Sequence, residues 1–196
     1  MAIRFQYNKT SLQGVEKHLK MRLRALPTIK NKESALRMEV KRAKDEASAL
    51  EAKLEQQIHS YDRMMMLWNE FDPTLVSVQD VQMSVRKVAG VRVQMLDRVL
   101  FAVRPYSLFN SPKWYPDGIV LLQTLAQTGM EHEFCLMKIE LLEHARKKTT
   151  QKVNLFEKVQ IPGYEDAILK IKRFMEDEEN LSKSSQKIMK QFTVAP

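Results

Sequence analysis

A histidine and a cysteine that could bind a metal ion lie three positions apart, at His132 and Cys135. At that spacing the two side chains would share one face of a helix. A structural zinc site needs four ligands, and the remaining histidines, His18, His59 and His144, form no pair at the spacing of a metal motif. We therefore expect half-buried positions on a helix here and no metal site.

Other candidates for chemistry are also weak. The acidic run MEDEEN at residues 175–180 could bind a cation, but such a run is more often the solvated face of a helix. Met64, Met65 and Met66 could form an adaptable binding surface, although packing near a helix end is the more frequent role. The sequence contains no phosphate-binding loop, dinucleotide-binding glycine pattern or G-x-S-x-G motif. We expect no catalytic residues and no cofactor, so the chain would not itself be an enzyme.

Positive charge is concentrated near the N-terminus. The 196 residues carry a formal net charge of +8. Residues 1–44 alone hold 12 Lys and Arg against 3 Glu, a balance of +9, which should attract an acidic or polar partner. Nucleic acid or a membrane surface would suit this charge, but no aromatic residues are interleaved with the bases, and no Trp or Phe follows Phe5 in the segment. We expect the segment to face protein.

The cellular compartment can be inferred from the cysteine count and the hydropathy pattern. Cys135 is the only cysteine, which excludes an internal disulfide and is typical of a reducing compartment. The first ten residues lack the apolar core of a secretory signal, and no apolar run approaches the ~20 residues of a membrane span. We expect a cytoplasmic protein without membrane insertion.

Two long segments, 9–70 and 117–192, have apolar residues at steps of three and four, which predicts amphipathic helices. The first stripe comprises Leu12, Val15, Leu19, Leu23, Leu26, Ile29, Leu36, Val40, Ala43, Ala47, Leu50, Leu54, Ile58, Tyr61, Met65 and Trp68. The second comprises Leu122, Leu125, Met130, Phe134, Met137, Leu141, Ala145, Val153, Phe156, Val159, Ala167, Ile171, Phe174, Leu181, Ile188 and Phe192. Alternating steps in the first stripe indicate heptads, and two successive steps of four between 50 and 58 predict a stutter.

Proline and capping residues mark the expected ends and kinks. Thr10 or Ser11 would cap the first helix, and Asp117 would cap the second. Proline removes a helix hydrogen bond, so we expect kinks at Pro27 and at Pro162–Gly163.

Residues 73–116 have a different composition. Their valine-rich, partly alternating pattern predicts short strands, which could pair as a hairpin, followed by a proline-rich loop. Turn signals lie at Ala89–Gly90 and near Asp97, and the strand register stays open.

The expected fold is mainly all-α: a long antiparallel two-helix coiled coil with a small β-hairpin-like insert at its tip. The N-terminal helix would occupy 1–72, the insert 73–116 and the C-terminal helix 117–196, all in one structural unit. A short four-helix bundle broken at the prolines is the alternative.

Four stretches carry a resemblance to a known family. They are TSLQGVEKHLKMRLRALPTIKNKESAL (10–36), VAGVRV (88–93), TTQKVNLFEKVQIP (149–162) and the acidic run before KIMK (187–190). The most specific spacing is that of Val153, Asn154, Glu157, Ile161 and Pro162. In these stretches the sequence resembles the D subunits of V-type and archaeal-type rotary ATPases. It departs from the family where Pro27 replaces a Gly-His pair, Gln151-Lys152 an Arg pair, and Leu155-Phe156 Ala-Leu, and where Gly163 follows the proline.

The resemblance implies a central rotor shaft that is not catalytic. It would stand in a hexamer of alternating nucleotide-binding A and B subunits, catalytic and non-catalytic. It would also join the small rotor F subunit and the funnel-shaped C/d subunit, peripheral to the inner (plasma) membrane on its cytoplasmic side. Rotation would couple ATP synthesis or hydrolysis to ion translocation; the direction and the ion stay open. The alternative is a coiled-coil scaffold or adaptor for partner helices or, less readily, for nucleic acid or a membrane surface.

Three hypotheses about sites follow from the resemblance. The residues expected to face the hexamer bore are Arg22, Arg24, Lys30, Lys32 and Arg37. A bend at Pro162–Gly163 would make the shaft asymmetric. The residues expected to dock a neighbouring subunit through the insert are Val88, Gly90, Val91 and Val93.

Overall fold

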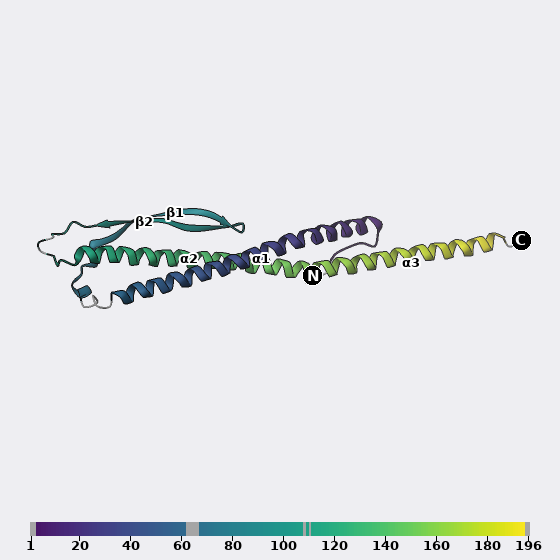
Figure 1. Ribbon diagram of the computed structural model, residues 1–196. Helices are drawn as coiled ribbons and strands as arrows, with labels where there is room; N and C mark the ends of the chain where they lie inside the picture. Colours follow the sequence, from purple (N-terminus) through teal and green to yellow (C-terminus); the bar gives the residue numbers. More distant parts are fainter. Residues whose placement is uncertain (1–2, 62–66, 108, 110, 195–196) are drawn as a thin grey trace. The chain divides into compact units, whose positions relative to one another are not determined.

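The computed structural model describes residues 3–61, 67–107, 109 and 111–194, with the side chains of 192–194 excepted (Figure 1). The long elements of these residues are α1 (Lys9–Ser60), β1 (Val76–Val88), β2 (Val91–Val103), α2 (Tyr115–Leu155), a π turn (Phe156–Gln160) and α3 (Ile161–Val194). Short 3-10 turns occupy Leu67–Glu70 and Pro73–Leu75. The expected class, long packed helices with an inserted hairpin, is confirmed. The predicted methionine surface at 64–66 lies outside the described residues.

The chain divides into two compact units, which we describe separately. The hairpin unit is Ser34–Lys147, and the terminal unit combines Met1–Glu33 with Lys148–Pro196. The expected organisation as one structural unit stays a prediction.

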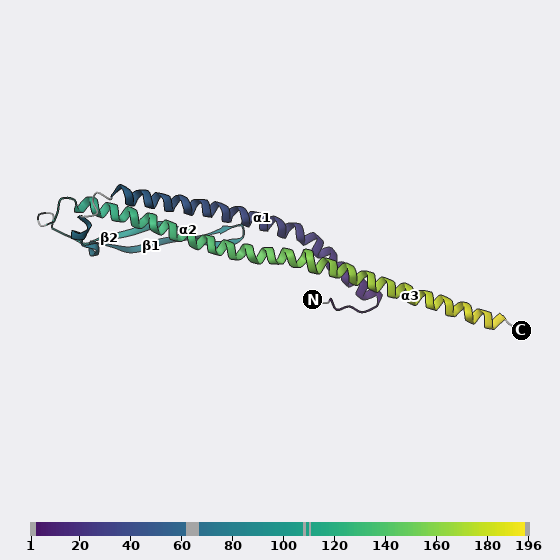
Figure 2. The ribbon, with the colours of Figure 1, turned by 90° about the horizontal axis from the view of Figure 1, so that it is seen from below.

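In the hairpin unit, α1, α2 and the β-hairpin share one core. Leu36 and Leu142 are fully buried, and Val93 of β2 is 1% exposed beside them. Val88 and Val91, next to the hairpin turn, pack against the same cluster. The hairpin therefore lies along α2, as both ribbon views show (Figures 1 and 2).

The other end of the hairpin belongs to a second, aromatic cluster. Phe71, Leu75 and Ile119 are buried there, and Trp68 and Trp114 stack edge to face at 5.8 Å. A Cβ on Gly118 would come 2.9 Å from the Trp114 ring, so α2 needs glycine at this close approach. Ile119 and Leu142 are 23 positions apart on α2, about 35 Å at 1.5 Å per residue. The insert is thus longer than expected and returns from the tip along the helices.

The strand register, left open by the sequence, is set by the turn and two bulges. Val88 pairs with Val91, and Ala89 and Gly90 have φ of 49° and 81°, as a two-residue primed turn requires. The predicted turn at Ala89–Gly90 is confirmed, whereas the one near Asp97 is wrong. Asp97 is the unpaired residue of a bulge and accepts a hydrogen bond from Ser84 Oγ at 2.9 Å.

The terminal unit packs the start of α1 against α3. Val15, Ala167 and Ile171 form its buried core. The residues before α1 fold onto α3, with the Tyr7 and Phe174 rings 4.7 Å apart.

Helix capping differs from the sequence expectation at both predicted starts. Asn8, not Thr10 or Ser11, caps α1, because its Oδ1 accepts the N–H of Ser11 at 2.7 Å. Helix α2 begins at Tyr115, and Asp117 lies within its first turn.

The α1 helix is unbroken from Lys9 to Ser60. It continues through Pro27, which is exposed, and the expected kink there stays a prediction. Buried and half-buried positions alternate in steps of three and four without a stutter, because Arg22 and Gln57 occupy the positions predicted for Leu23 and Ile58, which are each 46% exposed. The continuous positions are Leu12, Val15, Leu19, Arg22, Leu26, Ile29, Glu33, Leu36, Val40, Ala43, Ala47, Leu50, Leu54 and Gln57.

The packing face of α2 differs from the predicted stripe. Met137 and Leu141 are each 45% exposed, while Cys135 and Leu142 are buried. The observed heptad positions are Leu121, Leu125, Thr128, His132, Cys135, Ile139, Leu142, Arg146, Thr149, Val153 and Phe156. A small polar residue and a cysteine on this face obscured the repeat in the sequence.

Candidate functional site

The motif at 149–162 and part of the basic N-terminal segment meet in the terminal unit. There, residues 22–33 of α1 face the end of α2, the π turn and the start of α3. The sequence predicted both sets of residues but assigned the basic ones to a partner protein. The structure brings Arg22 and Lys30 against this chain's own helix.

Arg22 occupies a packing position on α1 and makes the closest contacts of this site. Its Nε donates to Gln160 Oε1 at 2.7 Å, and its Nη1 donates to the His18 carbonyl at 3.1 Å. The guanidinium carbon lies 4.5 Å from the Tyr164 ring centroid and 6.0 Å from that of Phe156. A planar guanidinium suits such a site because it can stack on aromatic rings and hydrogen-bond in its plane at the same time.

Polar contacts continue toward the middle of α1. Lys30 Nζ donates to Glu157 Oε1 at 2.8 Å, with both side chains 47% exposed. Thr150 Oγ1 donates to Glu33 Oε1 at 3.2 Å. The motif residue Glu157 therefore has an intramolecular role in joining the two helices.

A π turn lies immediately before Pro162, where a kink is expected; the kink itself stays a prediction. The Ile161 N–H donates to the Phe156 carbonyl, five residues back, instead of to the residue four back. Pro162 has no N–H, and in a regular helix its ring would clash with the carbonyl four residues earlier. The wider turn immediately before Pro162 accommodates this constraint.

Gly163 leaves room for the N-terminal segment. A Cβ at this position would lie 3.1 Å from Ile3 Cδ1, closer than most side chains tolerate. Each residue of Pro162–Gly163 thus has a local structural role: Pro162 follows the π turn, and Gly163 allows the close contact with Ile3. The pair's predicted role in making a shaft asymmetric stays a prediction.

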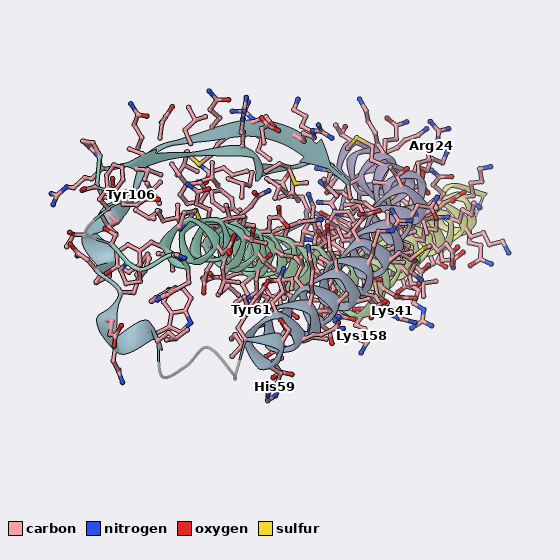
Figure 3. All side chains as sticks on the ribbon, turned by 60° about the vertical axis from the view of Figure 1, so that its left-hand side comes forward. Arg24, Lys41, His59, Tyr61, Tyr106 and Lys158 are labelled. Carbon is pink, nitrogen blue, oxygen red and sulfur yellow. The ribbon has the colours of Figure 1, made fainter. Side chains whose placement is uncertain are left out.

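Four of the five predicted bore residues are exposed: Arg24, Lys30, Lys32 and Arg37. Of these, Lys30 pairs with Glu157, and Arg24 lies on the outer side of α1 (Figure 3). Of the motif residues, Asn154 and Pro162 are exposed. Val153 and Ile161 are half-buried.

The predicted docking residues of the insert mostly face the helices. Val93 is buried, and Val88 and Val91 pack against the core of the hairpin unit, while Gly90 is exposed in the turn. The opposite face presents apolar side chains to solvent: Met83 is 54% exposed and Val85 65%. A docking role for the original four stays a prediction.

A cavity of about 250 Å³ lies between the hairpin and the helices of the hairpin unit. Lys138, 12% exposed, forms an ion pair with Glu46 at 2.8 Å within its wall. Cys135 donates its thiol hydrogen to the Ala43 carbonyl at 3.3 Å. Burial, and secondly the charge of Glu46, raise the pKa of this thiol. Within the described ranges, His, Cys, Asp and Glu form no group of three placed to hold a metal ion.

The C-terminal part of α3 is exposed over residues 176–191. The acidic run is a solvated face as predicted, and Glu179 pairs with Lys183 at 2.7 Å. Leu181 and Met189 are 70% and 71% exposed. None of the helices within the described residues is both long and apolar enough to cross a bilayer.

Sequence reasoning missed Gln160 and Tyr164 as partners of Arg22. The signal was available: Phe156, Gln160 and Tyr164 follow each other in two successive steps of four, which breaks the alternation of α2.

Comparisons with known proteins give a consistent result. Residues 11–191 match the model of the ATP synthase D-subunit family. The chain is 30% identical over 191 residues to the V-type ATP synthase D subunit of Borreliella burgdorferi, and the match covers 95% of this chain and 94% of the relative. It is 28% identical over 182 residues to the protein of the same name from Chlamydia muridarum, with 90% of each chain covered.

Proposed function

The chain belongs to the ATP synthase D-subunit family and is the central-stalk subunit of a V-type ATP synthase, and from this premise we propose that it turns as a non-catalytic rotor. Rotation would couple ATP synthesis or hydrolysis to ion translocation. The coupling would need no chemistry from this chain, only faces that differ around its axis.

One observation supports this mechanical role above the others. Helix α1 keeps a continuous packing face from Leu12 to Gln57, and within the hairpin unit its partner positions on α2 follow the same repeat. Such a seam resists twisting because each side chain is held by several neighbours on the facing helix. A stalk that transmits torque requires this property.

The proposed partners are a hexamer of A and B subunits, the small rotor F subunit and the funnel-shaped C/d subunit. Arg24, Lys32 and Arg37 support a contact with polar or acidic loops of the hexamer, because their cations lie on the surface of α1. Interactions between exposed charges are weak individually and are screened by salt. Such a contact suits a bearing, which must guide the shaft without gripping it.

The outward apolar face of the hairpin supports a second contact, with another rotor subunit. Met83 and Val85 are 54% and 65% exposed on a two-stranded sheet whose other face is already packed. Charging this face with Met83→Lys and Val85→Lys should reduce co-purification of the small rotor F subunit. The same two changes to Thr, which keeps strand propensity, serve as the control.

The function is tested by co-expression of the chain with the A and B subunits. We expect it to elute with the hexamer, and we expect ATP-driven ion transport to be lost when it is omitted. Replacing Arg24 and Lys32 by Gln should lower transport most at low salt, whereas the matched pair Lys41→Gln and Lys53→Gln should not. Failure of the chain to elute with the hexamer would reject the proposal.

A further inference from the structure

In the terminal unit, α1 packs against the end of α2, the π turn and α3, and we call this contact the seam. Its two sides contain different numbers of residues. On α1 the packing repeat is unbroken from Leu12 to Glu33. On the facing side the repeat runs to Phe156 and then resumes one position late. Ile171 and Met175 are buried and half-buried, whereas Lys170 and Phe174, where an unshifted repeat would fall, are exposed.

The π turn accounts for this one-residue offset. A π turn closes its hydrogen bond over five residues instead of four, so it holds one residue more than the α-helical turn it replaces. Beyond it, Ala167 and Ile171 are buried in the core, and Tyr164, Ile168 and Met175 pack against them. Without it, an unshifted repeat would keep Ala167 at the core but would place Gly163, Lys170 and Phe174 where Tyr164, Ile171 and Met175 now lie. The turn is therefore what brings the larger apolar side chains into the seam.

Arg22 lies opposite the offset. It contacts Phe156, Gln160 and Tyr164. These are the three successive packing positions over which the repeat shifts by one residue. An extra residue widens the facing helix locally, and an aliphatic side chain on α1 would leave part of that space empty. The long arginine side chain reaches across it and satisfies the Gln160 amide oxygen.

We propose that Phe156–Gln160 is a built-in flexure of the stalk: a stored extra residue that Arg22 holds in place and that folding does not require. The inference rests on the proposed rotor function for its purpose, but its structural part stands alone. Deleting one residue from the turn would leave Tyr164 and Ile171 facing the seam, now in an uninterrupted repeat. Pro162 requires the wider turn locally, but the packing of the seam does not, so we infer that the proline and the turn are retained together for use in the working complex.

The structural part is tested on the full chain. Val159, 41% exposed, is the residue to delete, together with Pro162→Ala so that the new helix contains no proline clash. Pro162→Ala alone is the reference, and Val159→Ala controls for loss of the side chain. We expect the deletion to keep or raise the thermal midpoint and to slow amide hydrogen exchange at 156–163 at least tenfold.

Arg22→Leu supplies the decisive comparison. In the reference it should lower the thermal midpoint by roughly 2–4 °C, and in the deletion variant it should leave the midpoint unchanged or raise it, because the widened space is gone. An equal loss in both backgrounds would show that Arg22 does not respond to the turn. A deletion variant that fails to fold would show that the turn is a requirement of folding. Either result overturns the proposal.

The functional part uses the reconstituted complex. With the deletion variant we expect ATP hydrolysis to continue and ions transported per ATP to fall at least twofold relative to Pro162→Ala. Unchanged coupling would overturn the flexure. Failure of the wild-type chain itself to restore transport would instead reject the proposed rotor function, so the two failures are distinguishable.

Discussion

Arg22 Nε on α1 donates a hydrogen bond to Gln160 Oε1 at 2.7 Å, 138 positions along the chain. The bond places a cation at a packing position of a helical seam, where an apolar residue is the usual choice. Stacking on Tyr164 at 4.5 Å lowers the cost of that choice.

The stacking geometry predicts that charge alone will not replace Arg22. Arg22→Lys should lower the free energy of unfolding by about 1 kcal/mol, because lysine keeps the charge but loses the planar stack. Urea denaturation measures the change. Arg24→Lys, on the exposed side of α1, is the control and should change nothing. Equal stability of both variants would argue against the arrangement at Gln160.

Two neighbouring leucines test the packing face of α2. Leu142 is fully buried between α1 and β2, so Leu142→Ala should cost about 2–5 kcal/mol of unfolding free energy. Leu141 is 45% exposed, and Leu141→Ala should cost less than about 0.5 kcal/mol. The sequence pattern favoured Leu141 as the core residue, so a larger loss at Leu141 in urea denaturation would restore that prediction.

The helices could be predicted from the sequence because their repeat spans many turns. Which residues of each helix face its partner could not be predicted in detail. Thr128, Cys135 and Arg22 occupy packing positions, whereas the apolar stripes predicted from hydropathy do not include them. Their burial depends on the hydrogen bonds available in the folded chain: Thr128 donates its hydroxyl hydrogen to the Thr124 carbonyl, and Arg22 donates to Gln160.

In the hairpin and in the site, too, the features set by local sequence could be predicted, and those that depend on tertiary contacts could not. The Ala89–Gly90 turn is a local signal and was predicted, while the bulge at Asp97 depends on pairing with β1 and was not. The motif around Glu157 was recognised, but its pairing with Lys30 needs the two helices to be in register. A π turn leaves no residue signature beyond Pro162 and two successive steps of four.

The buried thiol should resist modification. Burial, and then the charge of Glu46, raise the pKa of Cys135, so the thiolate is scarce at neutral pH as well as inaccessible. A thiol reagent at about pH 8 should label the native chain at least a hundredfold more slowly than the urea-unfolded chain. Equal rates would contradict the packing of α2 against Ala43.

One ion pair should make stability depend on acid pH. Lys44, through a hydrogen bond and then through its charge, lowers the pKa of Glu143 from its ordinary value of 4.5. Because the folded pKa lies below the unfolded one, this stabilisation is complete above the unfolded pKa and is lost as pH falls through the folded pKa. Glu143→Gln should therefore lower the urea midpoint at neutral pH, and its difference from wild type should shrink below pH 4.5. Glu140→Gln, exposed on the same helix, is the control; a difference that grows in acid would reverse the assignment.

Direct observation of rotation tests the rotor function itself. A cysteine at the exposed position Lys113, outside every surface proposed above for a partner, can carry a bead, since the native Cys135 is buried. With the A and B subunits fixed to a surface, we predict that ATP drives the bead in one direction and that removing ATP stops it. A bead that stays still, or only fluctuates, while the fixed complex hydrolyses ATP would contradict the account.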